Sequence, residues 1–297
     1  MTSATVYVPG TCGELAQGML DGSHFLVSCP VDLFSAVSVE VTDEGRIIAP
    51  SDAPKAARAL RAALSFFGLD RLGVRLTIDS PIPRSKGMGS STADVAGAIY
   101  ALALALGRDI APRDVARLAL SIEPTNSSLF LNLALFDHRQ GRISEDLGPP
   151  VPAEVMVLDC GGEVDTVAYN RVDRTRMLRT LEPLASEALT LIREGQALGD
   201  IYLIGQGAII SARAHQKVLA KAPLESIISA AHEAGAAGVN VAHSGTVIGV
   251  LFPPDRPNKC LVAAHFQSLF PSMTVVGWHR LIGGGCHRVG AGTKAHI

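Results

Sequence analysis

The segment PRSKGMGSSTA, residues 83–93, restricts what this chain can fold into more than any other stretch. It follows GVRLTIDS, which alternates like a strand, and it precedes a nearly continuous apolar run that ends at Gly107. Glycines at 87 and 89 let the backbone turn sharply and let a bulky group approach it closely. The segment therefore predicts a strand, a tight loop and a buried helix over roughly residues 91–106.

This loop and the start of the helix after it form a predicted anion site. The first N–H groups of a helix lack intrahelical partners, and the helix dipole is positive at this end. Lys86 adds a full charge, and the hydroxyls of residues 90–92 can ligate Mg²⁺ or a phosphate oxygen. The alternative is an ordinary helix capped by Ser or Thr after a glycine turn. The loop matches neither G-x-x-x-x-G-K-[ST] nor G-x-G-x-x-G.

A carboxylate at the end of the next predicted helix, residues 112–122, gives a second indication. Val115, Leu118 and Ala119 mark the inward face of that helix, and Glu123 leans to the same side. The helix dipole disfavours a carboxylate at a C-terminus by up to ~1 kcal/mol. Glu123 is therefore expected to hold a cation such as Mg²⁺, unless it is a solvated side chain at a frayed end.

Two further segments combine small and polar residues. TVYVPG is expected to be a strand that ends at Pro9-Gly10, before a tight turn that carries Glu14 and Gln17. In GVNVAHSGTVIGVLF, residues 238–252, a Ser-Gly turn opens a buried strand. His243 in this segment fits a structural histidine better than a catalyst.

Composition and charge exclude several classes of protein. The chain of 297 residues is 47% hydrophobic and 18% charged, with a net charge of −2, so neither nucleic acid nor a membrane surface is an expected partner. The apolar run from Val95 to Gly107 is too short to span a bilayer, and the N-terminus lacks the pattern of a signal peptide. Five scattered cysteines, with no C-x-x-C, fit a reducing cytoplasm.

The chain is expected to divide into two domains. GPPVPAE, residues 148–154, has three prolines and is the best linker, which gives domains 1–150 and 151–297. Strands are expected at 34–41 and 155–159, RIIA after the turn at 43–45 is expected to return antiparallel, and two more strands lie near 245–252 and 273–279. Helices are expected at 54–68, 174–194, 198–215 and 224–234.

Together these segments resemble the GHMP kinase superfamily. PRSKGMGSSTA is similar to its phosphate loop, P-x-x-x-G-L-G-S-S-[AG]-[AS], with Met88 in place of Leu. VPGTCGELAQG and VAHSGTVIGVLF resemble its first and third motifs, in the correct order along the chain. The resemblance implies an α+β fold of two domains, an N-terminal one like ribosomal protein S5 domain 2 and a ferredoxin-like C-terminal one.

Within the superfamily, GTCGELAQG, CPVDLFSAVSV and SIEPTNSSLF most resemble the L-threonine kinases of cobalamin biosynthesis. The resemblance implies ATP-dependent phosphorylation of L-threonine to L-threonine O-3-phosphate, with Mg²⁺, in the cytoplasm. A homodimer is compatible with it.

The resemblance also assigns roles to individual positions. The nucleotide phosphates would lie against Pro83, Lys86, Gly87, Met88, Gly89, Ser90, Ser91 and Thr92. Ser91 and Glu123 would hold Mg²⁺, and Lys86 and Ser91 would act in catalysis together with position 126. The acceptor would lie against Thr11, Cys12, Gly13 and Glu14, with Asp32 on its amino group and Ser244 and Gly245 closing over the site.

One position departs from the family pattern. The family usually has Asp after Glu-Pro-Thr, and this chain has Asn126. In several relatives that carboxylate is the proposed base, and an amide cannot accept the proton of the attacking hydroxyl. Phosphoryl transfer depends chiefly on positioning and charge neutralisation, so slow kinase activity is expected. The alternatives are a kinase for another small alcohol, such as homoserine or a mevalonate-like acid, and a silent nucleotide-binding module.

Overall fold

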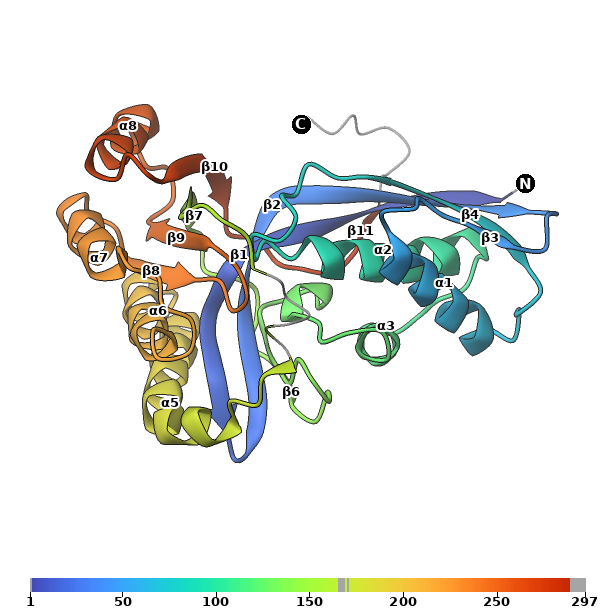
Figure 1. The fold of residues 1–297 in the computed structure, drawn as a ribbon, viewed down its shortest axis with the longest axis horizontal. Helices are drawn as coiled ribbons and strands as arrows, with labels where there is room; N and C mark the ends of the chain where they lie inside the picture. Colours follow the sequence, from blue (N-terminus) through green and yellow to red (C-terminus); the bar gives the residue numbers. More distant parts are fainter. Residues whose placement is uncertain (1, 165–168, 170, 289–297) are drawn as a thin grey trace.

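Two long strands joined by a tight turn run through the whole molecule and organise its fold (Figure 1). In the computed structural model, which describes residues 2–164, 169 and 171–288, β1 (Ser3–Leu20) pairs antiparallel with β2 (Ser23–Thr42). Asp21 and Gly22 between them have φ values of 49° and 76°. Two positive φ angles are typical of a type I′ turn, whose twist matches that of the flanking strands.

The expectation that the first strand ends at Pro9-Gly10 is wrong. β1 continues through both residues, but its register with β2 shifts between Pro9 and Thr11, again before Glu14, and again before Ala16. Proline has no N–H to donate, so a strand tolerates it where the ladder is already irregular. Thr11 N instead donates to Met88 O at 2.8 Å, which fixes the bulged segment of β1 against the glycine loop.

A single sheet connects the two ends of the molecule. Its strands lie in the order β10-β7-β9-β8-β1-β2-β4-β3, where β4 is Gly73–Asp79 and β3 is Ile47–Ile48. β3 pairs parallel with β4, which is antiparallel to β2, so RIIA does return antiparallel to the strand before it, but β4 lies between the two. Three short strands lie off this path: β5 (Ala134–Phe136) pairs with β2 and with β6 (Ser144–Asp146), and β11 (His287–Arg288) pairs with β1.

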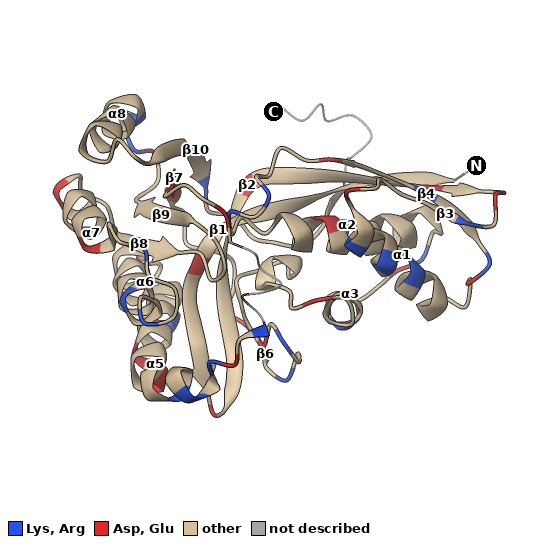
Figure 2. Ribbon diagram, in the orientation of Figure 1, with Lys and Arg blue, Asp and Glu red and all other residues tan. Residues whose placement is uncertain are grey.

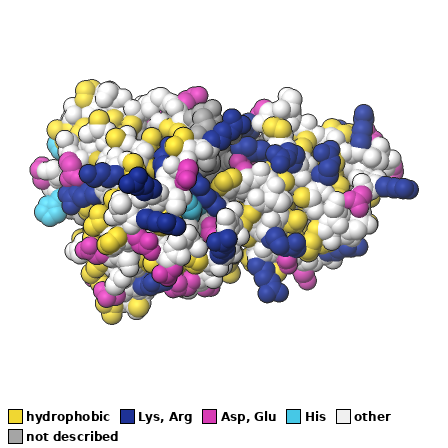
Figure 3. All heavy atoms as spheres, turned by 60° about the horizontal axis from the view of Figure 1, so that its bottom comes forward, with side chains coloured by type: hydrophobic (Ala, Val, Ile, Leu, Met, Phe, Trp, Pro, Cys, Tyr) yellow, Lys and Arg dark blue, Asp and Glu magenta, His cyan; other side chains and the backbone are white. Residues whose placement is uncertain are grey.

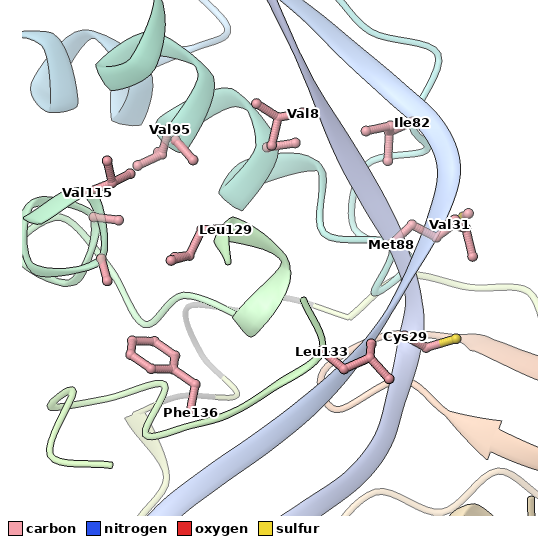
Figure 4. Close-up of a cluster of buried hydrophobic side chains, with 14 of the residues drawn as sticks. Val8, Cys29, Val31, Ile82, Met88, Val95, Val115, Leu129, Leu133 and Phe136 are labelled. Carbon is pink, nitrogen blue, oxygen red and sulfur yellow. The ribbon is translucent and has the colours of Figure 1, made fainter. Parts of the chain in front are cut away.

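One lobe is built on β2, β4 and β3. The helices α1 (Pro54–Phe66), α2 (Ser90–Ala105) and α3 (Pro112–Leu120) lie together beside these strands (Figure 1), and α2 packs on both β1 and β2. Figure 4 shows the core between them, where Met88, Val95, Leu129 and Phe136 are each at most 1% exposed. Leu129 comes from a short 3₁₀ helix, η1 (Ser127–Leu129). The three predicted helices of this lobe are confirmed.

The other lobe holds β7 (Glu154–Asp159), β8 (Gly238–Val241), β9 (Val247–Phe252) and β10 (Thr274–Arg280). Its helices are α5 (Thr175–Leu198), α6 (Ile201–His215), α7 (Leu224–Glu233) and α8 (Lys259–Leu269). The first three confirm predicted helices, whereas α8 was not expected. α5 and α6 pack on β1, and β1 pairs with β8, so the sheet continues past the expected boundary at residue 150, which stays a prediction.

Charged residues are interspersed over both lobes (Figure 2). Figure 3 shows the same mixture of signs on another face, where the surface narrows between the lobes. This agrees with the near-zero net charge. Among the described residues, no helix is both long and apolar enough to cross a membrane.

Candidate active site

A cavity of about 330 Å³ lies where β1, α1, α2 and the segment after α3 meet. Most residues predicted from the glycine loop line it, together with residues from six other segments. Its wall includes Thr11, Glu14, Leu26, residues 52–56, Arg84, Ser85, residues 87–92, Asp94, Val95, residues 123–126, His138, His243 and Ser244. Segments distant in sequence therefore converge at the loop that the sequence singled out.

The glycine loop presents the open end of α2 to this cavity. Gly89 is the N-cap of α2 with φ of 71°, and no side chain accepts a hydrogen bond from the first turn. The alternative of a helix capped by Ser or Thr is therefore wrong. A Cβ on Gly87, where φ is 83°, would lie 2.4 Å from Ala242 Cβ, so this position needs glycine. Uncapped N–H groups, glycines and three hydroxyls give the cavity wall the chemistry of a phosphate site.

Lys86 does not line the cavity. Its Nζ lies 2.8 Å from Asp159 Oδ2 and 2.7 Å from Gly162 O, so its charge is engaged with the segment after β7. Thr246 Oγ1 donates to the same Asp159 side chain at 2.5 Å. These bonds tie the glycine loop to the second lobe. Pro83, also predicted at the phosphates, lies outside the cavity wall as well.

Glu123 and Ser91 are brought together as the sequence predicted. Ser91 Oγ donates to Glu123 Oε1, and the Glu123 side chain is only 14% exposed, so the alternative of a solvated carboxylate is wrong. Lys55 Nζ donates to Glu123 Oε2 at 2.5 Å. Sequence reasoning assigned Lys55 no role, because the position of residues 51–55 just before a helix was the only indication that they approach the nucleotide. Hydroxyl and carboxylate oxygens are ligands that suit Mg²⁺, which keeps further positions for phosphates and water.

The side-chain amide of Asn126 is held in one orientation. Its Oδ1 accepts from Ser128 N at 3.1 Å and from Ser128 Oγ at 2.6 Å. Nδ2 therefore faces the glycine loop, where it lies 2.8 Å from the position of a Cβ on Gly89. Position 126 thus presents a hydrogen-bond donor to the cavity and no proton acceptor.

The first motif divides into residues that reach the cavity and residues that support it. Thr11 and Glu14 line the wall. Cys12 and Gly13 lie behind it: Cys12 O accepts from Asn240 Nδ2, and Gly13, with φ of 60°, lies against the backbone of β8.

The third motif divides in the same way. Ser244 lines the cavity, whereas Gly245 lies beneath the glycine loop. A Cβ on Gly245 would be 2.2 Å from Lys86 O, so this close backbone approach needs glycine.

Asp32 lies outside the cavity wall. Its carboxylate accepts from Arg280 N and Arg280 Nε, both at 2.8 Å, and lies 3.5 Å from His279 Nδ1. These hydrogen bonds hold the pKa of Asp32 well below its usual value. The structure therefore offers no support for Asp32 as the partner of a substrate amine, because β10 already satisfies it.

Glu14 is the carboxyl group that the cavity leaves unsatisfied. It is 5% exposed, and no described residue forms a hydrogen bond with its Oε2. Burial raises the pKa of Glu14 to about 8, although a hydrogen bond from Ser28 opposes this. His138 is 2% exposed on the same wall with both ring nitrogens unpaired, and burial lowers its pKa to about 3.

Comparison with known proteins gives consistent results. Residues 53–136 match the family described as GHMP kinases N terminal domain. The chain is 35% identical to the L-threonine kinase of Salmonella typhimurium, over 85% of this chain and 84% of that protein. It is 34% identical to the L-threonine kinase of Citrobacter freundii, over 85% and 88%. The solved homoserine kinase of Cytophaga hutchinsonii shares the fold, with a TM-score of 0.72 at 16% identity over 97% and 96% of the two chains.

Proposed function

Because this chain belongs to the GHMP kinase family and is an ATP-dependent kinase, we propose that it phosphorylates the hydroxyl of L-threonine. The product is L-threonine O-3-phosphate, made in the cytoplasm for assembly of the cobalamin nucleotide loop. The observation that carries the proposal is the likeness to two L-threonine kinases along most of the chain.

The nucleotide phosphates bind at the start of α2 in this proposal. Gly87, Gly89 and the uncapped first turn supply N–H groups for them. Lys55 and Arg84 are the lysine and arginine of the cavity wall, and Lys55, beside Glu123, takes a role that the sequence suggested for Lys86. Mg²⁺ fits the hydroxyl of Ser91 and the carboxylate of Glu123; when bound, it neutralises charge on the phosphates.

Asn126 positions a reacting oxygen and does not remove its proton. Its Nδ2 is aimed at the glycine loop, where it can donate to the acceptor hydroxyl or to a phosphoryl oxygen. General base catalysis is worth typically ~10²–10⁴-fold, so turnover continues at a reduced rate without a carboxylate at this position.

Phosphorus NMR of the purified chain with Mg-ATP tests the proposal. L-Threonine should give a phosphothreonine signal that is missing from a sample without acceptor. A parallel sample with L-homoserine identifies the alternative substrate. If ATP binds but its phosphoryl group is transferred to neither acceptor, the chain is a silent nucleotide-binding module and the proposal is refuted.

A further inference from the structure

One end of the cavity holds buried polar atoms that have no hydrogen-bond partner among the described residues. The ring of His138, whose centroid lies 5.0 Å from that of His243, is unpaired at both nitrogens and offers one donor and one acceptor as a neutral imidazole. The other atoms, which can accept, are Thr11 Oγ1, Glu14 Oε2 and His243 Nε2, and each is shielded from solvent. All three residues line the cavity wall. A buried polar group left unpaired costs about 1–3 kcal/mol, so a cluster of them points to a ligand that pairs with them.

Glu14 is held in place by the strands around it. Its carboxyl group accepts a hydrogen bond from the side chain of Ser28. Ser28 is fixed in turn, because Ser28 N donates to Ser127 Oγ at 3.0 Å and Ser127 N donates to Ser28 Oγ at 3.1 Å. Glu14 also pairs with Val241 across the junction of β1 and β8. Only its Oε2 therefore remains available to a ligand.

His243 presents a bare lone pair. Gln17 Nε2 donates to Val241 O at 3.3 Å, which turns Gln17 Oε1 toward His243 Nδ1 at 2.7 Å. Since Oε1 can only accept, the hydrogen of the neutral ring must be on Nδ1, and Nε2 is an acceptor. Gln17 donates to Val241, and Val241 is the residue of β8 that pairs with Glu14 of β1. Glu14 Oε2 and His243 Nε2 therefore lie at the same junction between these two strands.

None of the described residues supplies a cation to Glu14. The titratable groups around it are Cys12 on β1, Cys29 on β2, and the two imidazoles His138 and His243. The cavity wall also carries two cations, but Lys55 is paired with Glu123 and Arg84 with Asp52. Burial lowers the pKa of both imidazoles, so they are neutral at pH 7, and neither thiol is cationic in any state. No described residue forms an ion pair with Glu14.

Two basic residues near the imidazoles do not supply a cation to Glu14 either. Lys221 donates to Ala242 O at 3.0 Å, and Arg139 acts on the imidazoles only by disfavouring their protonation. Among the described residues, no group of three or more His, Cys, Asp or Glu side chains is arranged to hold a metal ion. The missing cation therefore belongs to the ligand. A primary ammonium carries one positive charge and three N–H donors, which match the carboxylate oxygen of Glu14 and two further acceptors, Thr11 Oγ1 and His243 Nε2.

We propose that Glu14, with His243 and Thr11, forms an ammonium subsite that selects amine-bearing acceptors, and that occupation of this subsite expels a proton from Glu14. The inference rests on the proposed function, since it concerns the amino group of the acceptor. It assigns to Glu14 the part that the sequence suggested for Asp32. The neutral imidazole beside the carboxylate accepts an N–H without repelling the incoming charge.

Calorimetric titration of the full chain with L-threonine tests the proton release. With a Glu14 pKa near 8, about 0.9 proton should leave per threonine bound at pH 7, measured in two buffers of different ionisation heat. The affinity should rise roughly 50-fold from pH 6 to pH 8. Release of no proton, together with an affinity that does not change between pH 6 and pH 8, would overturn the proposal.

Variants separate the subsite from other roles of Glu14. Glu14→Gln should raise KM for L-threonine about 30-fold or more and abolish the pH dependence, while KM for ATP stays unchanged. Asp32→Asn is the matched control and should leave KM for L-threonine within about twofold of the parent. If Glu14→Gln lowers kcat at unchanged KM, Glu14 is a base and the proposal fails.

Failure of the inference can be distinguished from failure of the proposed function. If the parent chain is silent with L-threonine, the same titrations with L-homoserine, which carries the same ammonium group, test the subsite alone. If 3-hydroxybutyrate, which lacks the amine, binds as tightly as L-threonine, the subsite is refuted while the kinase assignment stands. If no amine-bearing alcohol binds, both are refuted.

Discussion

Replacing Glu14 with Gln should make the ligand-free protein more stable, although it removes a residue of the active site. The pKa of Glu14 rises from 4.5 to about 8 on folding, because burial disfavours its ionised form. Below pH 4.5 the group is protonated in both the folded and the unfolded chain, and the substitution should change little. As the pH rises toward 8, the unfolded chain gains stability by ionising, and the folded chain does not.

The magnitude follows from the size of this pKa shift. Each pH unit above 4.5 costs the folded parent about 1.4 kcal/mol, up to the folded pKa. At pH 7 the advantage of Glu14→Gln is therefore on the order of 3 kcal/mol, which raises Tm by roughly 5–10 °C for a chain of this size. The neutral amide keeps the shape of the carboxyl and its bond with Ser28.

Thermal and urea unfolding, followed by circular dichroism at pH 5, 6, 7 and 8, would measure the effect. The difference in free energy of unfolding between variant and parent should grow with each pH step and level off near pH 8. A difference that is constant over this range, or in favour of the parent, would mean that Glu14 is ionised in the folded chain. The argument for an unsatisfied buried carboxyl would then be refuted.

Three further substitutions test other parts of the site. Asn126→Asp should raise kcat by about 10-fold or more in a coupled ADP assay, because one oxygen keeps the bonds from Ser128 and the other becomes a base; no gain would remove position 126 from that role. Asp32→Asn should cost about 1 kcal/mol at pH 7 in urea unfolding, since it breaks the pair with Arg280. Because the pKa of Asp32 is lowered on folding, that cost should shrink as the pH falls below about 4, and a cost as large at pH 2 as at pH 7 would contradict the ion pair. Gly245→Ala should weaken ATP binding at least about 10-fold in equilibrium titration and cost about 2 kcal/mol, because its Cβ meets the backbone of the glycine loop; unchanged ATP affinity would show that the contact is dispensable.

The parts of the site that local sequence determines could be predicted. The glycine loop, the start of α2 and the inward Glu123 all follow from helix ends and periodicity, and Ser91 and Glu123 do meet. The helices from α1 to α3 likewise follow from proline starts and apolar spacing. These features depend on neighbours within one or two turns.

The parts of the structure that long-range contacts determine could not be predicted from the sequence. Pro9-Gly10 has the composition of a turn, but β2 and the glycine loop hold it in a strand, and the true turn is at Asp21-Gly22. The surroundings of Asp32, predicted at the amino group of the acceptor, also depend on a distant contact. Asp32 is satisfied by Arg280, which is 248 residues away, and no local pattern reports such a partner.

The pairing of β1 has a consequence for how this chain is made. The first strand hydrogen-bonds with β8, and Val6 pairs with Arg288, near the far end of the sequence. On the ribosome, the β1–β2 hairpin emerges first and then waits for most of the chain to be synthesised before its outer edge is covered. An uncovered apolar strand is prone to join other chains. The nascent hairpin is therefore a segment that early binding of a chaperone would protect. Folding of the whole chain should also be slow, because the contacts of β1 with β8 and β11 join residues that are far apart in sequence.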